Sequence, residues 1–298
     1  MGDPKIQILM EALPYIKKFS GKTFVIKYGG SIMKNEEAKK AFIEDIVLMK
    51  LVGIKIVIVH GGGPNISELL EKLNIETKFV SGLRVTDEQT MEVVEMVLSG
   101  KVNKNLTREL CSHGIKAMGI SGIDGNLIEA KPKDMYKEGI KIDLGCVGEV
   151  ANVNTKLLIE LLENEYLPVI SPVGSDINGG VYNINADYVA SAISSALEAE
   201  KLIFLTDIKG IYRDINDPSS FVSKLSIKEA QKYIDEGIIQ GGMIPKTECS
   251  IKAIQSGTKN VHLIDGRMNH SLLLEIFTDD GIGTMIKGGI GQCLKKIS

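Results

Sequence analysis

Short runs of β-branched residues alternate with longer amphipathic segments along this chain, and this alternation is the feature that most constrains its fold. The first four segments are residues 23–27, 36–51, 55–59 and 65–73, in the order strand, helix, strand, helix. Strands that are connected through helices pair in parallel, because the chain must cross back over the sheet between them. The pattern therefore predicts an α/β fold with a mostly parallel central sheet.

The same rhythm continues after a different middle section. Between Gly119 and Val150, turn dipeptides separate short strands, which predicts hairpins. Capping boxes are predicted at Thr86 and Ser226, because each is followed three residues later by Gln or Glu. The strand–helix rhythm returns from Ala186 onward, so a boundary between two lobes is predicted there. The further expected segments are a helix at 155–163, strands at 167–172, 201–207 and 260–264, and helices at 227–236 and 245–255.

The composition excludes several classes of protein. The 298 residues are 44% hydrophobic, enough to bury a full core, and the net charge of −3 gives no basic surface for nucleic acid. No apolar run reaches the roughly 20 residues of a membrane-spanning helix, and the first residues lack the basic-then-apolar order of a signal peptide. The cysteines, at positions 111, 146, 249 and 293, form no C-x-x-C pair. They give no zinc or dithiol motif and predict a cytoplasmic protein with reduced thiols.

The first predicted strand ends in a glycine-rich turn, Lys27-Tyr28-Gly29-Gly30-Ser31. Backbone without Cβ atoms can approach a phosphate closely, and a neighbouring lysine can meet the negative charge. The alternative is an ordinary Gly-Gly turn beside a lysine that extends into solvent. This turn is a candidate phosphate site whose strength depends on partners elsewhere in the chain.

The second strand ends in His60-Gly61-Gly62-Gly63-Pro64-Asn65, where the proline suits the first turn of a helix. Free N–H groups and the positive end of a helix dipole meet there, which favours an anion. A dinucleotide-binding fingerprint would have glycine in place of Ile66 and an acidic residue about 20 positions later, and neither is present. The nearest match to a Walker A loop has Pro245 before its lysine, so a P-loop is excluded as well. We interpret His60 as a strand-end residue rather than a base, because the sequence shows no partner for it.

Two further loops carry side chains that suit carboxylates and lysines. Arg84, in Ser81-Gly82-Leu83-Arg84-Val85-Thr86, precedes a predicted helix, and arginine forms paired hydrogen bonds with carboxylates. An exposed structural arginine is the alternative. Asn183 and Asp187 lie in Tyr182-Asn183-Ile184-Asn185-Ala186-Asp187, between a strand and a helix. Asp187 is either a helix cap or an anchor that orients lysines.

Two loops in the last third of the chain suit a nucleotide. The segment Thr206-Asp207-Ile208-Lys209-Gly210-Ile211-Tyr212 follows a buried strand, at the edge where open α/β sheets bind ligands. The segment Gly241-Gly242-Met243-Ile244-Pro245-Lys246 puts a lysine into the first turn of a helix. The helix dipole disfavours a cation in that position, so the lysine indicates an anionic ligand.

In this order, the motifs HGGGP, GLRVT, NINAD, TDIKG and GGMIPK resemble the amino acid kinase family, in the branch that acts on N-acetyl-L-glutamate. Each motif is weak alone, but together they are specific, and the similarity runs from Phe24 to Ile286. The resemblance implies a three-layer αβα sandwich. It also implies an oligomerisation helix at residues 1–20, a lobe at 21–185 that binds the amino acid and dimerises, and an ATP-binding lobe at 186–298.

The resemblance further implies a role for each motif residue. Two lysines stabilise charge on the transferring phosphoryl group and an aspartate holds them in place, which gives the catalytic set Lys27, Lys246 and Asp187. Backbone N–H groups cradle the phosphates at Gly29, Gly30, Gly61 and Gly62. The substrate is expected to contact Gly62, Gly63, Arg84 and Asn183. The nucleotide is expected to border Thr206, Asp207, Lys209, Gly210 and Tyr212.

The implied reaction is the ATP-dependent phosphorylation of the side-chain carboxylate of N-acetyl-L-glutamate, the second step of arginine biosynthesis. A carboxylate with a pKa of about 4.3 is already ionised at neutral pH, so the reaction needs no general base. Phosphoryl transfer depends mainly on positioning and on stabilisation of negative charge, which lysines and amides supply. Mg²⁺ is expected to arrive with ATP, without a dedicated cage of protein ligands.

The first residues of the chain form an apolar stripe between Ile6 and Ile16 that the motifs above do not need, and the stripe predicts an amphipathic helix. In the family, such an extension implies a hexamer built as a trimer of dimers, inhibited by L-arginine. Glu275 and Gly281, in the segment 275–284, are candidate contacts of that effector. The alternative is a helix that folds back on its own subunit.

Three other interpretations stay open at this point. A sister kinase acting on N-acetyl-aminoadipate, aspartate or glutamate would differ in pocket length, and one methylene changes selectivity only about 10- to 200-fold. A non-catalytic amino-acid sensor on the same fold would not need Lys27, Asp187 and Lys246. A nicotinamide-dependent dehydrogenase is disfavoured by the missing glycine and acidic residue.

Overall fold

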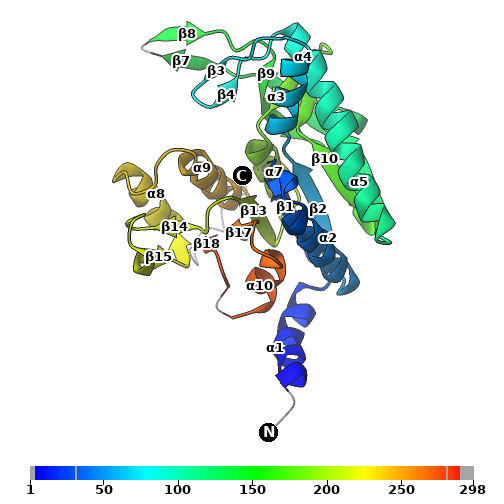
Figure 1. Cartoon of the computed structure of the whole chain (residues 1–298), viewed down its shortest axis with the longest axis vertical. Coiled ribbons are helices and arrows are strands. Elements are labelled where there is room, and N and C mark those ends of the chain that lie inside the picture. Colours follow the sequence, from blue (N-terminus) through cyan, green and yellow to red (C-terminus); the bar gives the residue numbers. More distant parts are fainter. Residues whose placement is uncertain (1–3, 31, 138, 280, 289–298) are drawn as a thin grey trace, which may run out of the picture. The chain divides into compact units, whose positions relative to one another are not determined.

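The computed structural model describes residues 4–30, 32–137, 139–279 and 281–288 of the chain (Figure 1). The chain divides into two compact units, one formed by residues 1–56 with 194–298 and the other by residues 57–193. The first strand therefore belongs to the same unit as the C-terminal third of the chain. The assignment of separate functions to residues 21–185 and 186–298 stays a prediction.

The discontinuous unit contains a five-stranded part of the sheet, in the order β16-β18-β17-β13-β1. All neighbours in it pair in parallel except β17 and β18, which confirms the predicted α/β class with a mostly parallel sheet. Its helices are α1 (Pro4–Phe19), α2 (Glu36–Leu51), α8 (Ile227–Asp235), α9 (Met243–Gln255) and α10 (Ser271–Phe277), with short turns η1 (Ile32–Lys34) and η4 (Pro218–Ser220). Its strands are β1 (Thr23–Tyr28), β13 (Lys201–Thr206), β14 (Ile211–Tyr212), β15 (Phe221–Val222), β16 (Lys224–Ser226), β17 (Asn260–Asp265) and β18 (Thr284–Lys287).

Helices cover both faces of this part of the sheet. On β17, His262 contacts Glu275 of α10, while α9 packs against the same strand. Because side chains alternate along a strand, Val261 and Leu263 point to the face opposite His262. Figure 1 shows α9 and α10 on the two sides of β17. The unit is thus layered as helix, sheet, helix.

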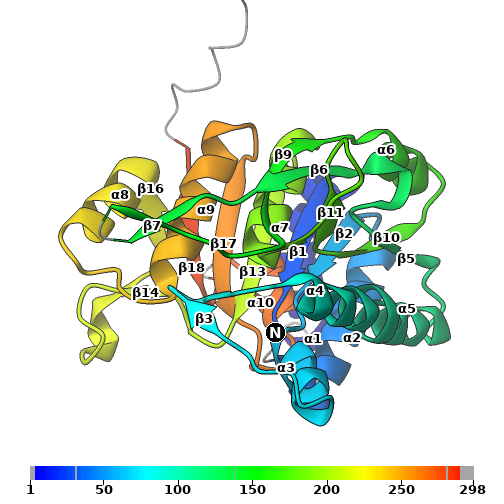
Figure 2. The ribbon, with the colours of Figure 1, turned by 90° about the horizontal axis from the view of Figure 1, so that it is seen from above.

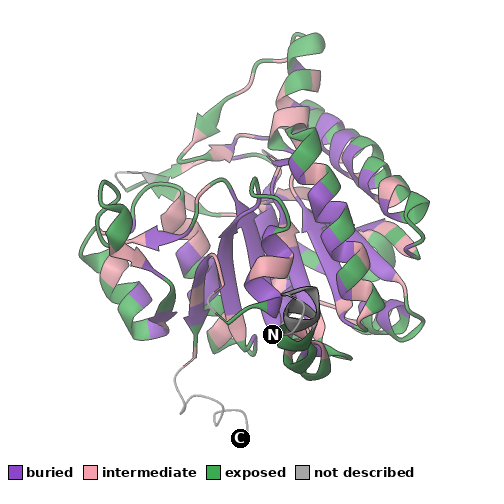
Figure 3. Ribbon diagram, turned by 60° about the horizontal axis from the view of Figure 1, so that its bottom comes forward, coloured by how far each residue is buried: buried purple, intermediate pink, exposed green. Residues whose placement is uncertain are grey.

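Burial explains why these segments form the centre of the layer. Phe24, Val25 and Ile26 of β1 are fully buried, as expected for a parallel strand covered on both faces. Figure 3 shows that buried residues concentrate on the strands. At the end of β1, the Tyr28 ring stacks on Phe42 of α2 with 4.1 Å between ring centroids.

The second unit combines a smaller parallel sheet, β2-β10-β5, with a closed set of four strands, β11-β12-β9-β6. The pairing of β6 with β9 and of β7 with β8 is antiparallel, which confirms the hairpin-rich section predicted between 119 and 150. Figure 2 shows α5 and α6 on either side of β10, and both helices pack against that strand. The helices are α3 (Gly63–Lys72), α4 (Glu88–Glu95), η2 (Met96–Val102), α5 (Asn103–Ser112), η3 (Asp124–Asn126), α6 (Lys156–Glu163) and α7 (Ala186–Ala196). The strands are β2 (Lys55–His60), β3 (Phe79–Val80), β4 (Leu83–Arg84), β5 (Ala117–Ser121), β6 (Ile128–Pro132), β7 (Met135–Lys137), β8 (Ile140–Ile142), β9 (Val147–Val153), β10 (Leu167–Ser171), β11 (Val173–Ser175) and β12 (Val181–Ile184).

One of the two predicted capping boxes is confirmed and the other is wrong. Ser226 accepts a hydrogen bond from the Glu229 amide, and the Glu229 carboxylate accepts one from the Ser226 amide. At α4 the cap is Asp87, whose carboxylate accepts from the Thr90 amide. Thr86 is fully buried and its hydroxyl donates to the Arg84 carbonyl instead. The helix cap is thus one residue later than predicted, and the Thr86 side chain lies in the protein interior.

The described helices include none that is both long and apolar enough to cross a bilayer. Cys111, Cys146 and Cys249 are free thiols, and Cys293 lies outside the described residues.

The N-terminal helix is confirmed as α1, although side chains before Met10 also lie outside the described part. Met10 and Leu13 of α1 are exposed, whereas Phe19 at its end is buried against Phe24.

A buried carboxylate holds α10 to α2 within the discontinuous unit. Asp45 of α2 is 1% exposed and accepts hydrogen bonds from the His270 ring at 2.7 Å and from the Leu272 amide at 3.2 Å. His270 precedes α10 in a left-handed conformation, and its other ring nitrogen lies 3.8 Å from Glu44. Burial raises the pKa of Asp45 to about 6, against the hydrogen bonds that lower it.

The substitution Asp45→Asn is expected to change how stability depends on pH. The folded-state pKa of Asp45 lies above its unfolded value, so this group contributes stability at low pH that is lost as the pH rises from about 4 to about 7. Asparagine does not titrate, so the wild-type free energy of unfolding, relative to the variant, should fall over that range. Urea unfolding at several pH values measures this difference. A difference that stays constant or grows with pH would contradict the account.

Candidate active site

Three parallel strands of the discontinuous unit end at the same edge of the sheet. Lys27 of β1 pairs with Phe204 of β13, and Thr206 of β13 pairs with Asp265 of β17. Because ligands of open α/β sheets bind beyond the carboxyl ends of the strands, this edge is a candidate site. It carries the first glycine-rich turn and the start of the segment 206–212.

The turn after β1 brings bare backbone close to a lysine. A Cβ atom on Gly29 would lie 3.0 Å from the Leu205 carbonyl oxygen and 3.9 Å from the Lys27 ammonium nitrogen. The Lys27 side chain therefore lies beside Gly29, as a phosphate site requires. Gly30 follows in the same turn.

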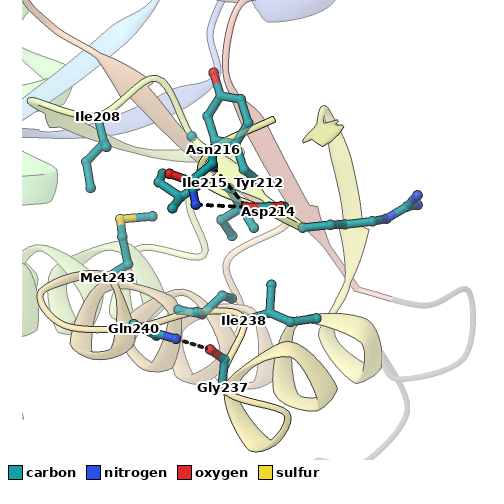
Figure 4. Close-up of a pocket in the computed structure, with 13 residues that line it drawn as sticks. Ile208, Tyr212, Asp214, Ile215, Asn216, Gly237, Ile238, Gln240 and Met243 are labelled. Carbon is teal, nitrogen blue, oxygen red and sulfur yellow. Dashed lines mark hydrogen bonds between the residues drawn. The ribbon is translucent and has the colours of Figure 1, made fainter. Parts of the chain in front are cut away.

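A cavity of about 630 Å³ lies between the loop after β13 and the start of α9 (Figure 4). Of the predicted nucleotide residues, Gly210 and Tyr212 line it, while Thr206, Asp207 and Lys209 do not. Figure 4 shows Ile208, Ile238 and Met243 around the space, an apolar wall that suits a flat aromatic base. Sequence reasoning missed the segment 237–240, because nothing in its residue types separates it from an ordinary turn.

Gly210 is essential to the shape of this loop. Its φ is +149°, and a Cβ atom there would lie 2.5 Å from the Thr284 hydroxyl oxygen. That hydroxyl accepts a hydrogen bond from the Ile211 amide and donates one to the Val222 carbonyl. Only glycine allows the loop to approach β18 this closely.

The helix α9 begins at Met243, which lines the cavity, and Lys246 is its fourth residue. The prediction of a lysine in the first turn of this helix is therefore confirmed. The preceding residue is Gly242, so no side chain caps the N–H groups of the first turn. The Met243 and Ile244 amides donate to the Gln240 and Gly241 carbonyls, and Pro245 has no N–H group. The Lys246 cation and the positive end of the helix dipole therefore remain as the features that favour an anion at this end of α9.

In the second unit, Arg84 on β4 is buried, with 7% of its surface exposed. One terminal nitrogen donates to the Ser67 hydroxyl at 2.7 Å and to the Gly63 carbonyl at 3.3 Å. The guanidinium stacks on the Phe79 ring at 4.7 Å. The alternative of an exposed structural arginine is thus wrong, and Arg84 lies at the start of the helix that follows the three glycines.

The second terminal nitrogen of Arg84 is buried and has no hydrogen-bond partner within the described residues. The side-chain oxygen of Asn65, in the same glycine-rich turn, is also buried without a partner in that part of the chain. Burial lowers the pKa of Arg84, yet arginine stays charged at any physiological pH. An unpaired buried donor on a cation is costly, so the geometry is that of a site for an anion.

The predicted substrate residue Asn183 adjoins this arginine through Thr86. The Asn183 amide nitrogen donates to the Thr86 hydroxyl at 3.3 Å, and that hydroxyl donates to the Arg84 carbonyl at 2.9 Å. Hydrogen bonds thus connect Gly63, Arg84, Thr86 and Asn183, and the role of these residues in substrate binding stays a prediction. Asp187 is buried in the first turn of α7, and its amide donates to the Asn185 side chain.

The candidate effector residues form a buried cluster elsewhere. Glu275 accepts hydrogen bonds from the His262 ring and from the amides of Ile282 and Gly283. The other His262 nitrogen lies 2.7 Å from the Lys201 ammonium, which sits 5.1 Å from the Phe19 ring centre at the end of α1. A Cβ atom on Gly281 would lie 2.8 Å from the Glu275 carboxylate.

Two further observations bear on charge at the strand ends. Arg267, just after β17, pairs with Asp265 through two hydrogen bonds of 2.9 and 2.8 Å, and sequence reasoning did not single it out. A charged pair directly after a predicted strand was the signal that would have found it.

Among the described residues, no group of three or more His, Cys, Asp or Glu side chains is placed to hold a metal ion.

Comparisons with known proteins agree with this geometry. Residues 22–265 match the model of the amino acid kinase family. The chain is 54% identical over 282 residues to an acetylglutamate kinase of Thermoanaerobacter pseudethanolicus, covering 95% of this chain and 93% of that one. An acetylglutamate kinase of Caldanaerobacter subterraneus is 55% identical over 282 residues, with the same coverage.

Solved structures show the same fold. The N-acetylglutamate synthase of Neisseria gonorrhoeae, complexed with coenzyme A and N-acetyl-glutamate, has a TM-score of 0.81 at 27% identity. The alignment covers 96% of this chain, which spans 64% of the length of that synthase. The carbamate kinase of Giardia lamblia bound to AMP-PNP has a TM-score of 0.65 at 16% identity, covering 90% of this chain and 99% of that one.

Proposed function

This chain belongs to the amino acid kinase family, and we propose that it transfers the γ-phosphoryl group of ATP to the side-chain carboxylate of N-acetyl-L-glutamate. The products are N-acetyl-L-glutamyl 5-phosphate and ADP, and the reaction is the second step of arginine biosynthesis. Acetylglutamate kinases that share 54% or 55% of its residues over nearly the whole chain support this activity. We place the reaction in the cytoplasm, where free thiols such as those of Cys111, Cys146 and Cys249 stay reduced.

The observation that carries the proposal is the buried guanidinium of Arg84 with an unpaired N–H group. A substrate with two carboxylates can present one to this arginine and the other to the phosphoryl donor. A carboxylate that accepts a hydrogen bond from the Arg84 guanidinium is a weaker nucleophile, so we assign the non-reacting α-carboxylate to this arginine. Asn183, joined to Arg84 through Thr86, is assigned to the same substrate.

The transfer of the phosphoryl group is assigned to two lysine side chains and to backbone N–H groups. Lys27 and Lys246 oppose the negative charge that develops on the transferring group, and the N–H groups of Gly29, Gly30 and Gly61 hold the phosphates. The ionised carboxylate attacks without a general base, because it has no proton to lose at neutral pH. Asp187, buried at the start of α7, is assigned the orientation of the lysines.

The nucleotide is assigned to the cavity of about 630 Å³ beside Gly210, Tyr212 and Met243. Its apolar wall accepts the base, and we assign the phosphates to the end nearest the N-terminus of α9, where the helix dipole is positive. Mg²⁺ would be held mainly by the ATP phosphates and would neutralise part of their charge. Thr206, Asp207 and Lys209, at the end of β13, are assigned to the same nucleotide from its phosphate side.

Regulation by L-arginine is part of the same proposal. We assign the effector to the cluster of Glu275, His262 and Lys201, where a cationic ligand would share the Glu275 carboxylate with the His262 ring and two backbone amides. The helix α1 reaches this cluster through Phe19. An arginine bound there would act on the position of α1. Gly281 is assigned to the same effector site.

We further propose that α1, with exposed Met10 and Leu13, joins dimers into a hexamer.

The reaction is tested by incubating the protein with MgATP and trapping acyl phosphate with hydroxylamine as a coloured hydroxamate. N-acetyl-L-glutamate should react best, compared in parallel with N-acetyl-aminoadipate, glutamate and aspartate. Added L-arginine should lower the signal. Preference for another acid would overturn the substrate, and no product with any acid would overturn the kinase activity in favour of a sensor.

The substitution Lys246→Ala is expected to lower kcat by about 100-fold or more while the protein stays folded, because it removes a cation from the transferring group. Lys252→Ala is the matched control, since this exposed lysine lies on the same helix α9 away from its N-terminus. Steady-state kinetics and circular dichroism measure both effects. Equal kcat in the two variants would remove Lys246 from the mechanism.

A further inference from the structure

His60 ends β2 directly before the three glycines, and its imidazole is fully buried. One ring nitrogen, Nδ1, lies 2.8 Å from the carbonyl oxygen of Gly61. The other, Nε2, lies 3.2 Å from the side-chain nitrogen of Asn103 on α5. Both ring nitrogens therefore have partners, which the sequence did not reveal.

Asn103 fixes which nitrogen of His60 carries the proton. The Asn103 side-chain nitrogen also lies 2.8 Å from the Val169 carbonyl and 3.2 Å from the Ile120 carbonyl. Carbonyl oxygens only accept, so this atom must be the amide NH₂ group, whose two hydrogens face three acceptors: the two carbonyls and His60 Nε2. An amide NH₂ group cannot accept a hydrogen bond from a protonated Nε2. His60 Nε2 is then an acceptor, and Nδ1 carries the hydrogen that is donated to the Gly61 carbonyl.

This donated hydrogen bond orients the peptide group between Gly61 and Gly62. The described peptides are all trans, so the Gly62 N–H points opposite to the Gly61 carbonyl. The carbonyl is turned toward the buried imidazole, and the N–H is therefore turned away from it. Within the described residues, the Gly62 amide makes no hydrogen bond to protein. It lies at the start of α3, where N–H groups and the dipole favour an anion.

The imidazole stays neutral in this environment. Burial lowers the pKa of His60 to about 4, and the hydrogen bond to Gly61 opposes this only in part. No charged side chain of the described residues is among the causes of the shift. At neutral pH the ring therefore has one donor and one acceptor, and both are in use.

We propose that His60 is a positioning residue, held in one tautomer by Asn103, that fixes the Gly61–Gly62 peptide so that its N–H group faces the reacting ligands. This inference rests on the proposed kinase function, because it takes Gly62 as part of the anion cradle. Close packing supports it, since a Cβ atom on Gly62 would lie 2.5 Å from Leu98. A preoriented donor needs no rearrangement during transfer, which is the main source of electrostatic stabilisation in such sites.

Two isosteric substitutions separate this role from the alternatives. In His60→Asn, the amide nitrogen occupies the place of Nδ1 and still donates to the Gly61 carbonyl. In His60→Gln, the side-chain oxygen occupies the place of Nε2 and still accepts from Asn103, but the donor to Gly61 is lost. His113→Asn and His113→Gln are matched controls, because His113 is an exposed histidine of the same unit.

We expect His60→Asn to keep kcat/KM within about threefold of wild type and His60→Gln to lower it about 10- to 100-fold, mainly through kcat. Both variants should keep their circular dichroism spectra. Equal losses in the two folded variants would show that the imidazole itself is required, for example as a base, and would overturn the proposal. Unchanged kcat/KM in His60→Gln would overturn it as well. Wild-type hydroxamate formation in the same assay tests the kinase function separately.

A measurement on the unaltered protein keeps the proposal testable if a variant does not fold. The chain has four histidines, so ¹⁵N-histidine labelling gives four imidazole spin systems. His262 also donates from Nδ1, to Glu275, so the two buried rings are told apart by sequential assignment. The ring assigned to His60 should be neutral and protonated at Nδ1, unchanged between about pH 6 and about pH 8. If the His60 ring is charged or carries its proton at Nε2, the proposal fails.

Discussion

The buried, half-satisfied guanidinium of Arg84 is the constraint on which the substrate side of the molecule depends. A cation removed from water costs several kcal/mol unless it is paired, so the fold must supply partners or a ligand must. Ser67, the Gly63 carbonyl and the Phe79 ring supply part of this compensation, and one terminal nitrogen remains unpaired among the described residues. Gly63 contacts this charge directly, and Thr86 and Asn183 are hydrogen-bonded in turn to the main chain of Arg84. His60 fixes the orientation of Gly61, the first of the three glycines. The ligand that completes the arrangement must be an anion.

The nucleotide side follows a different physical rule, the convergence of strand ends in a parallel sheet. The parallel strands β1, β13 and β17 carry Lys27, Thr206 and Asp265 near one edge, because Lys27 lies opposite Phe204 and Thr206 lies opposite Asp265. The loop after β13 can then bend toward β18 only because Gly210 lacks a side chain. A cavity with an apolar wall results, next to the positive end of the α9 helix dipole. Those are the features that an adenine base and a row of phosphates need.

Local sequence patterns predicted the elements and the motif positions well, and tertiary contacts less so. The alternation of strands and helices placed β1, α2, β2 and α9 to within a few residues, because burial on both faces of a parallel strand leaves a continuous apolar run. The pattern at Thr86 misled, since a serine or threonine three residues before an acidic or amide side chain is equally compatible with a cap at Asp87. The pairs His60–Asn103 and His262–Glu275 join residues far apart in the chain. Each partner is ordinary in its own segment, so only the fold reveals them.

The account is tested most directly by the interaction between Arg84 and the non-reacting carboxylate. Wild type and Arg84→Gln are assayed with N-acetyl-L-glutamate and with 4-acetamidobutyrate, which has the same reacting carboxylate but no α-carboxylate. If Arg84 binds that group, wild type should prefer N-acetyl-L-glutamate in kcat/KM by about 100-fold or more, and the preference should shrink to less than about 10-fold in Arg84→Gln. The same preference in both proteins would contradict the account, because the buried arginine would then bind some other group.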